Sequence, residues 1–338
     1  MYRDVMHNLL ALLKNILMKK LILSVIIIFV CTDFYSQTSA TKLKYDMRTF
    51  IYKTIGQDSI KSNFFRISND TTICPIIIWI HGGAFIWGSR NDLPKEQLEF
   101  YLNAGYSVFS IDYRLAPETK LEQITQDIKD AIEWIQYNGK KLQIDSKKIF
   151  VIGHSAGGYL ALMTGYILNS PPCAIISFYG YGEILSKWCN QPDSNYLKWR
   201  LIPKENAYKL IHSSSLTSAL RKERFDLYLY SRQQGVWSNI ISGHNPIDEP
   251  QYFDQFCPIK NITEDFPPVL LIHGDKDTDV PFEQSVLLDE ALNNKDNDHK
   301  LIRMSGSDHA FDKFEGGFDN IQIKNVFNEV IKFMDKYR

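Results

Sequence analysis

Five short runs of apolar residues constrain the fold of this 338-residue chain more than any other feature of its sequence. Each run is continuous, without the alternation of polar and apolar residues that a half-exposed strand shows. Strands of this kind are buried on both faces, as in a parallel sheet that is covered by helices. The runs span residues 76–80, 108–111, 149–152, 174–178 and 269–272.

Amphipathic helical patterns lie between these runs. In residues 121–135 the apolar side chains recur on one face, and the C-terminal stretch 318–334 repeats the pattern. Because strands and helices alternate, we predict an α/β fold with a mainly parallel central sheet that is flanked by helices. Residues 47–53 and 63–67 are more typical of an antiparallel hairpin at the edge of that sheet.

The regular alternation stops between about residues 181 and 260, where aromatic residues mix with Lys and Arg. A structureless loop of that length is uncommon in a compact domain. We therefore predict a mostly helical cap at residues 181–260, inserted into a domain at residues 41–338 and packed over the strand ends. We interpret Arg232 of this cap as a surface residue, with contact to a carboxylate or hydroxyl of a ligand as the alternative.

The first 40 residues have the composition of a targeting segment. Two lysines follow Met18, an apolar stretch at residues 21–31 comes next, and small or polar residues fill positions 32–40. This order is that of a secretory signal peptide, with Met18 as the start of translation. The apolar stretch is shorter than the about 20 residues of a membrane-spanning helix. We therefore expect a secreted or periplasmic protein, with an uncleaved N-terminal membrane anchor as the alternative.

Export would place the chain in an oxidising compartment. Cys189 and Cys257 lie near the two ends of the cap, so a disulfide between them would close it, but the sequence does not determine the pairing. The formal net charge is -1, and no basic tract carries interleaved aromatic residues, so we expect no nucleic-acid partner. No CxxC pair or His/Cys cluster indicates a metal, and we expect no cofactor.

A GxSxG motif with Ser155 at its centre follows the apolar run at residues 149–152 and opens the apolar helix predicted at residues 156–168. A serine on a sharp turn between a strand and a helix has a strained backbone and an exposed hydroxyl, and glycines on either side leave room for it. The helix N-terminus adds the positive end of its dipole. From this motif alone, an ordinary Gly-rich turn between a strand and a helix is an equal alternative to a nucleophile.

A second motif, HGGAF at residues 81–85, follows the first apolar run. Acyl transfer places negative charge on a carbonyl oxygen, and backbone N–H groups aimed at that oxygen stabilise it by about 3 kcal/mol each. Glycines let the backbone approach the oxygen closely. Together with the N–H of Ala156, those of Gly83 and Ala84 would form such an oxyanion hole, and Gly82 is an alternative donor.

An acid and a base should follow the serine in that chain order. The apolar run at residues 269–272 leads into HGDKDTDVP, which contains three aspartates. We select Asp277 as the acid because it lies at the apex of the loop. Asp275 and Asp279 are interpreted as turn and helix-start residues.

His309 is the candidate base. It follows a flexible turn after the strand predicted at residues 299–304, from which an imidazole can reach Ser155. Other histidines have simpler interpretations. His81 and His273 flank motif turns, and we expect both to be structural, with His81 bracing its loop.

Five motifs thus occur in order: HGGAF at residues 81–85, DYRLAPE at 112–118, GHSAGG at 153–158, HGDKDTDVP at 273–281 and DH at 308–309. Together they resemble the esterase/lipase branch of the α/β hydrolases, in particular hormone-sensitive-lipase-like and feruloyl-esterase-like members. The resemblance runs from about residue 75 to the C-terminus, without most of the cap. It implies a serine hydrolase of carboxylic esters with nucleophile Ser155, acid Asp277 and base His309. Two departures, Ala84 and the serines before Asp308, stand where glycines are usual, and neither removes a required group.

The aromatic cap indicates a pocket with apolar walls for a small-molecule ester, with short-chain, aryl and acetylated-carbohydrate esters all open. Two other functions compete with this one. A prolyl-oligopeptidase-like peptidase would share the Asp277 motif, but such enzymes usually carry an N-terminal propeller, for which the sequence has little room after the leader. A catalytically silent binding protein with a hydrolase fold should lack a triad residue, and none is missing.

Overall fold

The computed structural model describes residues 43–338 and, before them, only residues 3, 6–7 and 17–18. The chain divides into two units, Met1–Lys44 and Tyr45–Arg338, and every element given below belongs to the second. The signal peptide predicted in residues 1–40, with its alternative of a membrane anchor, lies outside the described residues apart from those few positions. Within the described part of the chain, no helix combines the length and the apolar character that crossing a membrane requires.

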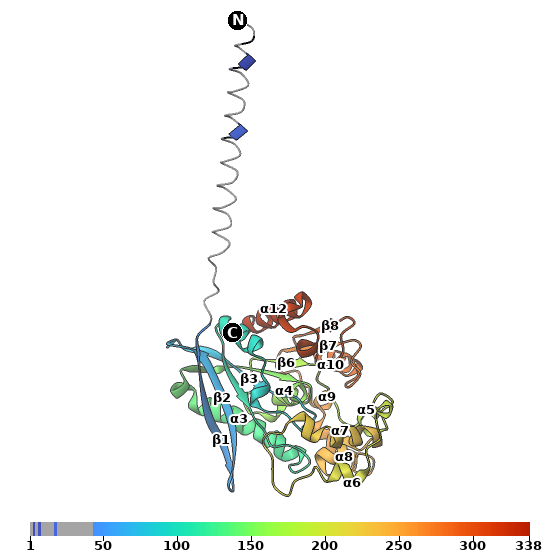
Figure 1. Ribbon diagram of the computed structural model, residues 1–338. Coiled ribbons are helices and arrows are strands. Elements are labelled where there is room, and N and C mark those ends of the chain that lie inside the picture. The colour runs from blue at the N-terminus through green and yellow to red at the C-terminus, as the bar shows by residue number, and fades with distance from the viewer. Residues whose placement is uncertain (1–2, 4–5, 8–16, 19–42) are drawn as a thin grey trace. The chain divides into compact units, whose positions relative to one another are not determined.

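An eight-stranded sheet forms the centre of the second unit (Figure 1). Its strands are β1 (Tyr45–Ile55), β2 (Asp58–Ile67), β3 (Cys74–Ile80), β4 (Ser107–Ile111), β5 (Ile144–His154), β6 (Ala174–Phe178), β7 (Val269–Gly274) and β8 (His299–Met304). They stand in the order β1-β2-β4-β3-β5-β6-β7-β8. The pairs β1/β2 and β2/β4 are antiparallel, and all the other pairs are parallel.

The order and directions of these strands confirm the predicted α/β fold. Each of the five continuous apolar runs lies within a strand, and the predicted edge hairpin is formed by β1 and β2. β5 starts earlier than predicted, because residues 145–148 are polar and at least partly exposed and so interrupt the apolar signal after Ile144.

Helices cover both faces of the sheet. They are α2 (Lys95–Asn103), α3 (Leu121–Leu142), α4 (Ala156–Ile167), α10 (Glu283–Asn293), α11 (Phe311–Phe314) and α12 (Ile321–Asp335), with short 3-10 turns η1 (Arg90–Asp92) and η4 (Gly317–Asp319). Ser177 of β6 lies next to Gly158 of α4, whereas the following residue, Phe178, stacks on Phe327 of α12. Because successive strand residues point to opposite faces, α4 and α12 lie on opposite sides of the sheet. α3 packs beside α4, and α2 packs against α12.

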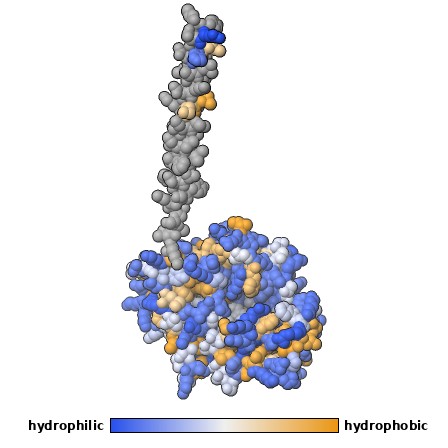
Figure 2. All heavy atoms as spheres, in the orientation of Figure 1, coloured by the Kyte–Doolittle hydropathy of each residue, from blue (hydrophilic) through white to orange (hydrophobic). Residues whose placement is uncertain are grey.

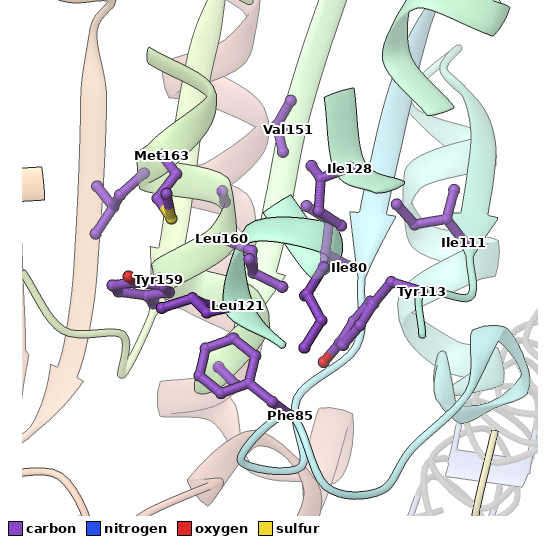
Figure 3. Packing of buried hydrophobic residues seen from close by; sticks show 14 of the residues in the cluster. Ile80, Phe85, Ile111, Tyr113, Leu121, Ile128, Val151, Tyr159, Leu160 and Met163 are labelled. Atoms are coloured by element: carbon purple, nitrogen blue, oxygen red, sulfur yellow. The ribbon is translucent and has the colours of Figure 1, made fainter. Parts of the chain in front are cut away.

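The apolar core between the sheet and α3 and α4 extends to the loop after β3. Figure 3 shows Ile80 of β3 close to Leu121 and Leu160, with Phe85 of that loop beside them. Phe85 is completely buried, and its ring packs edge-on against Tyr159 of α4. Burial of one such side chain stabilises the fold by about 2 kcal/mol. The loop that carries the HGGAF motif is therefore anchored in the core.

Between β6 and β7 the chain forms a series of helices. They are α5 (Lys187–Asn190), η2 (Tyr196–Lys198), α6 (Lys204–Tyr208), α7 (Arg221–Gln234), α8 (Trp237–Ser242), η3 (Pro250–Phe256) and α9 (Pro258–Asn261). All of them but α7 are short. In the view of Figure 2 most of the surface is hydrophilic, and apolar side chains gather over these helices. Leu197, Trp199 and Leu201 are among the exposed apolar residues of this region.

The cysteines of this region are unpaired. Cys189 and Cys257 are both buried and both free, so the disulfide considered from the sequence does not form. The Cys189 thiol instead contacts the carbonyl oxygen of Ser186 at 3.2 Å and the hydroxyl of Ser238 at 3.6 Å. Each of the two cysteines packs as a small apolar side chain.

Candidate active site

Ser155 occupies the turn between β5 and α4. Its backbone dihedrals are φ 56° and ψ -120°, a strained conformation for a residue with a side chain. The flanking glycines make this turn possible, since a Cβ atom on Gly153 would lie 1.9 Å from the carbonyl oxygen of Gly157. A Cβ atom on Gly157 would lie 2.2 Å from the carbonyl oxygen of Ile80. The sharp turn presents the hydroxyl of Ser155 to a cavity that it lines.

The structure brings together the three residues that the sequence assigned to one site. Nε2 of His309 lies 3.0 Å from Oγ of Ser155, and Nδ1 of His309 lies 2.6 Å from Oδ2 of Asp277. The Asp277 side chain is completely buried, whereas His309 is 17% exposed toward the cavity. A hydroxyl, an imidazole and a carboxylate in this order form the arrangement that activates a serine.

Asp277 accepts four hydrogen bonds. Its Oδ1 atom accepts the backbone N–H groups of Asp279 at 2.9 Å and Val280 at 2.8 Å. Its Oδ2 atom contacts His309 and also Nε2 of His273, which lies 3.1 Å away. Burial disfavours the charge of Asp277, but the two imidazoles outweigh this effect and hold the pKa of the carboxyl well below its usual range. The acid is therefore ionised throughout the neutral range.

His273 is a site residue that the sequence interpretation missed. Its Nε2 atom faces only acceptors, Oδ2 of Asp277 and the carbonyl oxygen of Val280 at 3.1 Å, so it must carry the proton. Nδ1 then accepts a hydrogen bond from the hydroxyl of Ser285 at 2.7 Å. His273 is completely buried at the end of β7. A histidine four residues before the acid was visible in the sequence, but its contact with the acid depends on how the loop turns back.

Asp275 behaves as the turn residue that the sequence predicts. Its carboxylate accepts the N–H of Gly306 at 2.7 Å and pairs with Arg303.

Asp279 is not the helix-start residue that the sequence predicts, because α10 begins only at Glu283. It forms an ion pair with Arg232, and its Oδ2 atom lies 3.7 Å from Nε2 of His309. The interpretation of Arg232 as a surface residue is wrong. Only 1% of its side chain is exposed, because the guanidinium lies between the carboxylates of Asp279 and Asp193.

The residues expected to form an oxyanion hole lie beside Ser155. Gly83 and Ala84 line the same cavity and have positive φ angles of 105° and 54°. Among the hydrogen bonds of the described residues, none uses the backbone N–H of Gly83, Ala84 or Ala156. These N–H groups are therefore available to a bound oxygen, and Ala84 leaves its backbone donor in place.

His81 has the bracing role that the sequence predicts. Its ring stacks on Tyr113 with 4.2 Å between centroids, and its Nδ1 contacts the carbonyl oxygen of Gly82 at 2.7 Å. Burial lowers the pKa of His81, so it stays neutral in this loop.

Tyr179, which follows β6, is a second residue that the sequence interpretation missed. Its ring packs edge-on against His309 with 4.7 Å between centroids. Its hydroxyl donates to Oδ1 of the buried Asp312 at 2.5 Å. Tyr179 thus supports the face of the base, a role for which no local sequence pattern gives a signal.

The cavity above Ser155 has a volume of about 350 Å³. Ser155 and His309 line it together with Gly82, Gly83 and Ala84, and further lining residues come from the region between β6 and β7. The aromatic residues that line it are Trp87, Tyr179, Tyr196, Trp199, Phe225, Tyr228 and Phe314. Among the described residues, no group of His, Cys, Asp or Glu side chains is arranged to hold a metal ion.

Comparison with known proteins identifies the family to which this site belongs. The family model named BD-FAE matches residues 64–292, more than half of the chain and including Ser155 and Asp277. The chain belongs to the BD-FAE family. This is a hormone-sensitive-lipase-like family, and the chain is accordingly an α/β hydrolase of the esterase/lipase branch. A dienelactone hydrolase family model also matches residues 256–338, which contain His309.

Curated relatives of this BD-FAE member include an esterase and parts of much larger proteins. It is 27% identical over 260 residues to esterase LipC of Mycobacterium tuberculosis, a match that covers 73% of this chain and 55% of LipC. It is 27% identical over 305 residues to the non-reducing polyketide synthase atr1 of Stereocaulon alpinum, a match that covers 79% of this chain and 12% of the synthase. The chain thus spans only part of the length of these relatives.

Solved structures share the fold. A protein of unknown function from Staphylococcus aureus superposes with a TM-score of 0.70 at 24% identity, over 86% of this chain and 99% of that one. Esterase 2 of Thermogutta terrifontis, solved with propionate bound, gives a TM-score of 0.62 at 22% identity, over 86% of this chain and 94% of that one. The BD-FAE chain therefore has the α/β-hydrolase fold.

Proposed function

We propose that this chain hydrolyses carboxylic esters of small molecules through an acyl-enzyme on Ser155. The observation that carries the proposal is the pair of contacts made by His309, at 3.0 Å to Ser155 and 2.6 Å to Asp277. The esterase relatives and the hydrolase families support the same reaction class.

The reaction follows from the chemistry of these groups. His309 accepts the hydroxyl proton of Ser155 at Nε2 as the oxygen attacks the ester carbonyl, and Asp277 holds the Nδ1–H tautomer and stabilises the imidazolium. The backbone N–H groups of Gly83, Ala84 and Ala156 donate hydrogen bonds to the negatively charged oxygen of the tetrahedral intermediate and stabilise it. The imidazolium then gives its proton to the leaving alcohol, and water attacks the acyl-enzyme by the same route.

The substrate pocket favours a small ester with an apolar or aromatic part. Trp87, Phe225 and Tyr228 all line the cavity, and the ring of Trp87 packs edge-on against the other two. Such rings bind apolar groups by burying apolar surface, and planar groups by stacked or edge-to-face contacts. A cavity of about 350 Å³ is at the lower end of the range for small-molecule sites.

Hydrolysis of a panel of nitrophenyl esters and of peptide anilides tests the proposal. We expect ester hydrolysis to exceed anilide hydrolysis and to fall by at least about 10⁴-fold in Ser155→Ala. Ser305→Ala, an exposed serine in the turn before the base, is the matched control and should keep its activity. Faster cleavage of the anilides would indicate a peptidase, and equal ester hydrolysis by Ser155→Ala would exclude Ser155 as the nucleophile.

We further propose that the N-terminal segment directs export to the periplasm or the exterior of the cell. The proposal rests on the apolar stretch at residues 21–31, which two lysines precede. Fractionation of cells that express the full chain, followed by N-terminal sequencing, tests it. A mature N-terminus near residue 40 in the exported fraction is expected, and an intact N-terminus in the cytosol would contradict the proposal.

A further inference from the structure

Asp279 is a second carboxylate that faces the base. Its Oδ2 atom lies 3.7 Å from Nε2 of His309, which is the nitrogen that contacts Ser155. Asp279, His309 and Ser155 all line the same cavity. The mechanism above uses Asp277 on the opposite nitrogen of the ring and gives Asp279 no role.

Side chains from the region between β6 and β7 hold Asp279 in place. Its Oδ1 atom accepts hydrogen bonds from the hydroxyls of Tyr196, at 2.8 Å, and Tyr228, and from Nη1 of Arg232, at 2.6 Å. Among the hydrogen bonds of the described residues, none reaches Oδ2 of Asp279. With every donor on Oδ1, the carboxylate is fixed with Oδ2 toward the imidazole.

We propose that Asp279 is a positioning residue, a negative charge that the cap holds beside His309 to favour the imidazolium and so to set the pH range in which the base works. The imidazolium forms when His309 takes the proton of Ser155, so a fixed negative charge near Nε2 stabilises the charge that develops in that step. This inference rests on the proposed function, because it assigns a role around the same base.

The charged groups that face His309 come from two segments. Asp277 and Asp279 belong to the loop after β7, and Asp308 precedes His309 in the chain. The turn between β5 and α4 contributes the neutral hydroxyl of Ser155, and the segment after β6 contributes the ring of Tyr179. Burial disfavours the imidazolium, but the three carboxylates outweigh it and raise the pKa of His309 to about 9.

Asp279 is itself ionised in the range where the base titrates. Burial disfavours its charge, but the charges of His309 and Arg232 outweigh this effect and lower its pKa. Asp277 acts in the opposite direction, and the hydroxyl of Tyr228 adds to the lowering. Removing the charge of Asp279 should therefore destabilise the protonated form of His309 and lower its pKa, without displacing Asp277.

The pH dependence of kcat/KM in Asp279→Asn tests the inference. The variant keeps the shape of the side chain and loses its charge. We expect the acidic limb of the profile, the pH range in which kcat/KM rises as His309 loses its proton, to move to lower pH by about one unit. An opposite charge within 4–6 Å has an effect of this size on the pKa of an ionisable group. Asp275→Asn is the matched control, because that carboxylate lies on the same loop but pairs with Arg303 away from the cavity. The acidic limb of the kcat/KM profile of Asp275→Asn should coincide with that of the wild type.

A second variant keeps the test decisive if Asp279→Asn does not fold. Tyr196→Phe removes one donor from Oδ1 of Asp279 and leaves the charge in place. With less of its charge shared in hydrogen bonds, the carboxylate should attract the imidazolium more strongly, so the limb should move to higher pH. Shifts of opposite sign in the two variants support the role of Asp279. A limb that stays at the wild-type pH in both variants, or in the one that folds, would overturn it.

Labelling by a fluorophosphonate separates this inference from the proposed function. The rate of labelling of Ser155 depends on the same base and requires no ester substrate. If the wild type hydrolyses no ester but is labelled, the limb is read from the labelling rate, and the expected shifts are the same. If the wild type neither hydrolyses esters nor is labelled, the proposed function fails and this inference fails with it.

Discussion

The imidazole of His309 lies among carboxylates, and its protonation determines what the site can do. Asp277 contacts Nδ1, whereas Asp279 lies near Nε2. The sequence was sufficient to select Ser155, Asp277 and His309, because each belongs to a motif at the end of a strand. The contacts of Asp279 with Arg232 could not be predicted, because they join segments that are distant in the sequence.

The charge of His309 makes the activity depend on pH. His309 must be neutral to accept the proton of Ser155, and its pKa is raised from 6.5 to about 9. The base therefore becomes competent only as pH rises through the raised pKa, and we expect kcat/KM to increase from neutral pH toward about 9. A profile of kcat/KM against pH measures this limb. A midpoint at or below the ordinary imidazole value would contradict the electrostatic account of the site.

The second prediction concerns His273. His273→Leu removes the N–H that donates to Asp277 and leaves a buried carboxylate with one donor fewer. Hydrogen bonds to charged groups contribute about 1.5–3 kcal/mol, so we expect kcat/KM to fall by about tenfold or more. The acidic limb should also move to higher pH, because the carboxylate then interacts more strongly with the imidazolium.

Ser285→Ala is the control for His273→Leu. It removes the hydroxyl that contacts Nδ1 and keeps the donor to the acid, so its effect should be much smaller. If both variants lower kcat/KM equally and neither moves the limb, His273 has only a packing role.

At the scale of elements, the sharp turn between β5 and α4, here called the elbow, determines where the hydroxyl of Ser155 lies. Its two flanking elements were predicted from sequence, because β5 carries a continuous apolar run and α4 is a mostly apolar stretch. That stretch is almost entirely buried in the structure. The helices between β6 and β7 were predicted only as a group. Except for the 14-residue α7, each is short and is held by tertiary contacts instead of by an amphipathic pattern. The sequence therefore holds no local signal for the residues at which these helices begin and end. The same reason explains why α2 was not predicted.

The glycines of the elbow give a prediction at this scale. In Gly153→Ala the new Cβ would lie 1.9 Å from the carbonyl oxygen of Gly157, so β5 or α4 must move. We expect a loss of stability of about 1–3 kcal/mol, measured by urea unfolding, together with most of the esterase activity. Gly56→Ala, in the turn between β1 and β2, has open space around it and should lose about 1 kcal/mol from backbone strain while keeping activity. Equal activity of both variants would show that the elbow tolerates displacement.

In the second unit as a whole, the region between β6 and β7 is joined to the rest by buried polar contacts. Arg224 of α7 pairs with Glu118, and both side chains are 1% exposed. The indole N–H of Trp237 donates to the carbonyl oxygen of Ala84 at 3.3 Å, which links α8 to the loop that carries the HGGAF motif. The cap at residues 181–260 stays a prediction. The sequence could not show how this region is attached, because the sequence does not distinguish a buried, paired charge such as that of Arg224 from a solvent-exposed one.

The attachment through Arg224 gives a prediction at this scale. Arg224→Met leaves Glu118 as an unpaired buried charge, which should lower the free energy of unfolding by about 3–5 kcal/mol in urea. The double variant with Glu118→Gln should recover part of this loss. Arg200→Met is the control, because Arg200 pairs with Asp226 on the surface of the same region and should contribute less than about 1 kcal/mol. Equal losses in the two single variants would contradict the attachment.

Peptide mass spectrometry can locate the covalent adduct of a fluorophosphonate and so test whether His309 activates Ser155. We expect the wild-type chain to carry one adduct, on Ser155, and Ser155→Ala to carry none. His309→Gln should label far more slowly, because the hydroxyl then has no base within hydrogen-bonding distance. An adduct on another residue, or labelling of His309→Gln at the wild-type rate, would contradict the claim that His309 activates Ser155.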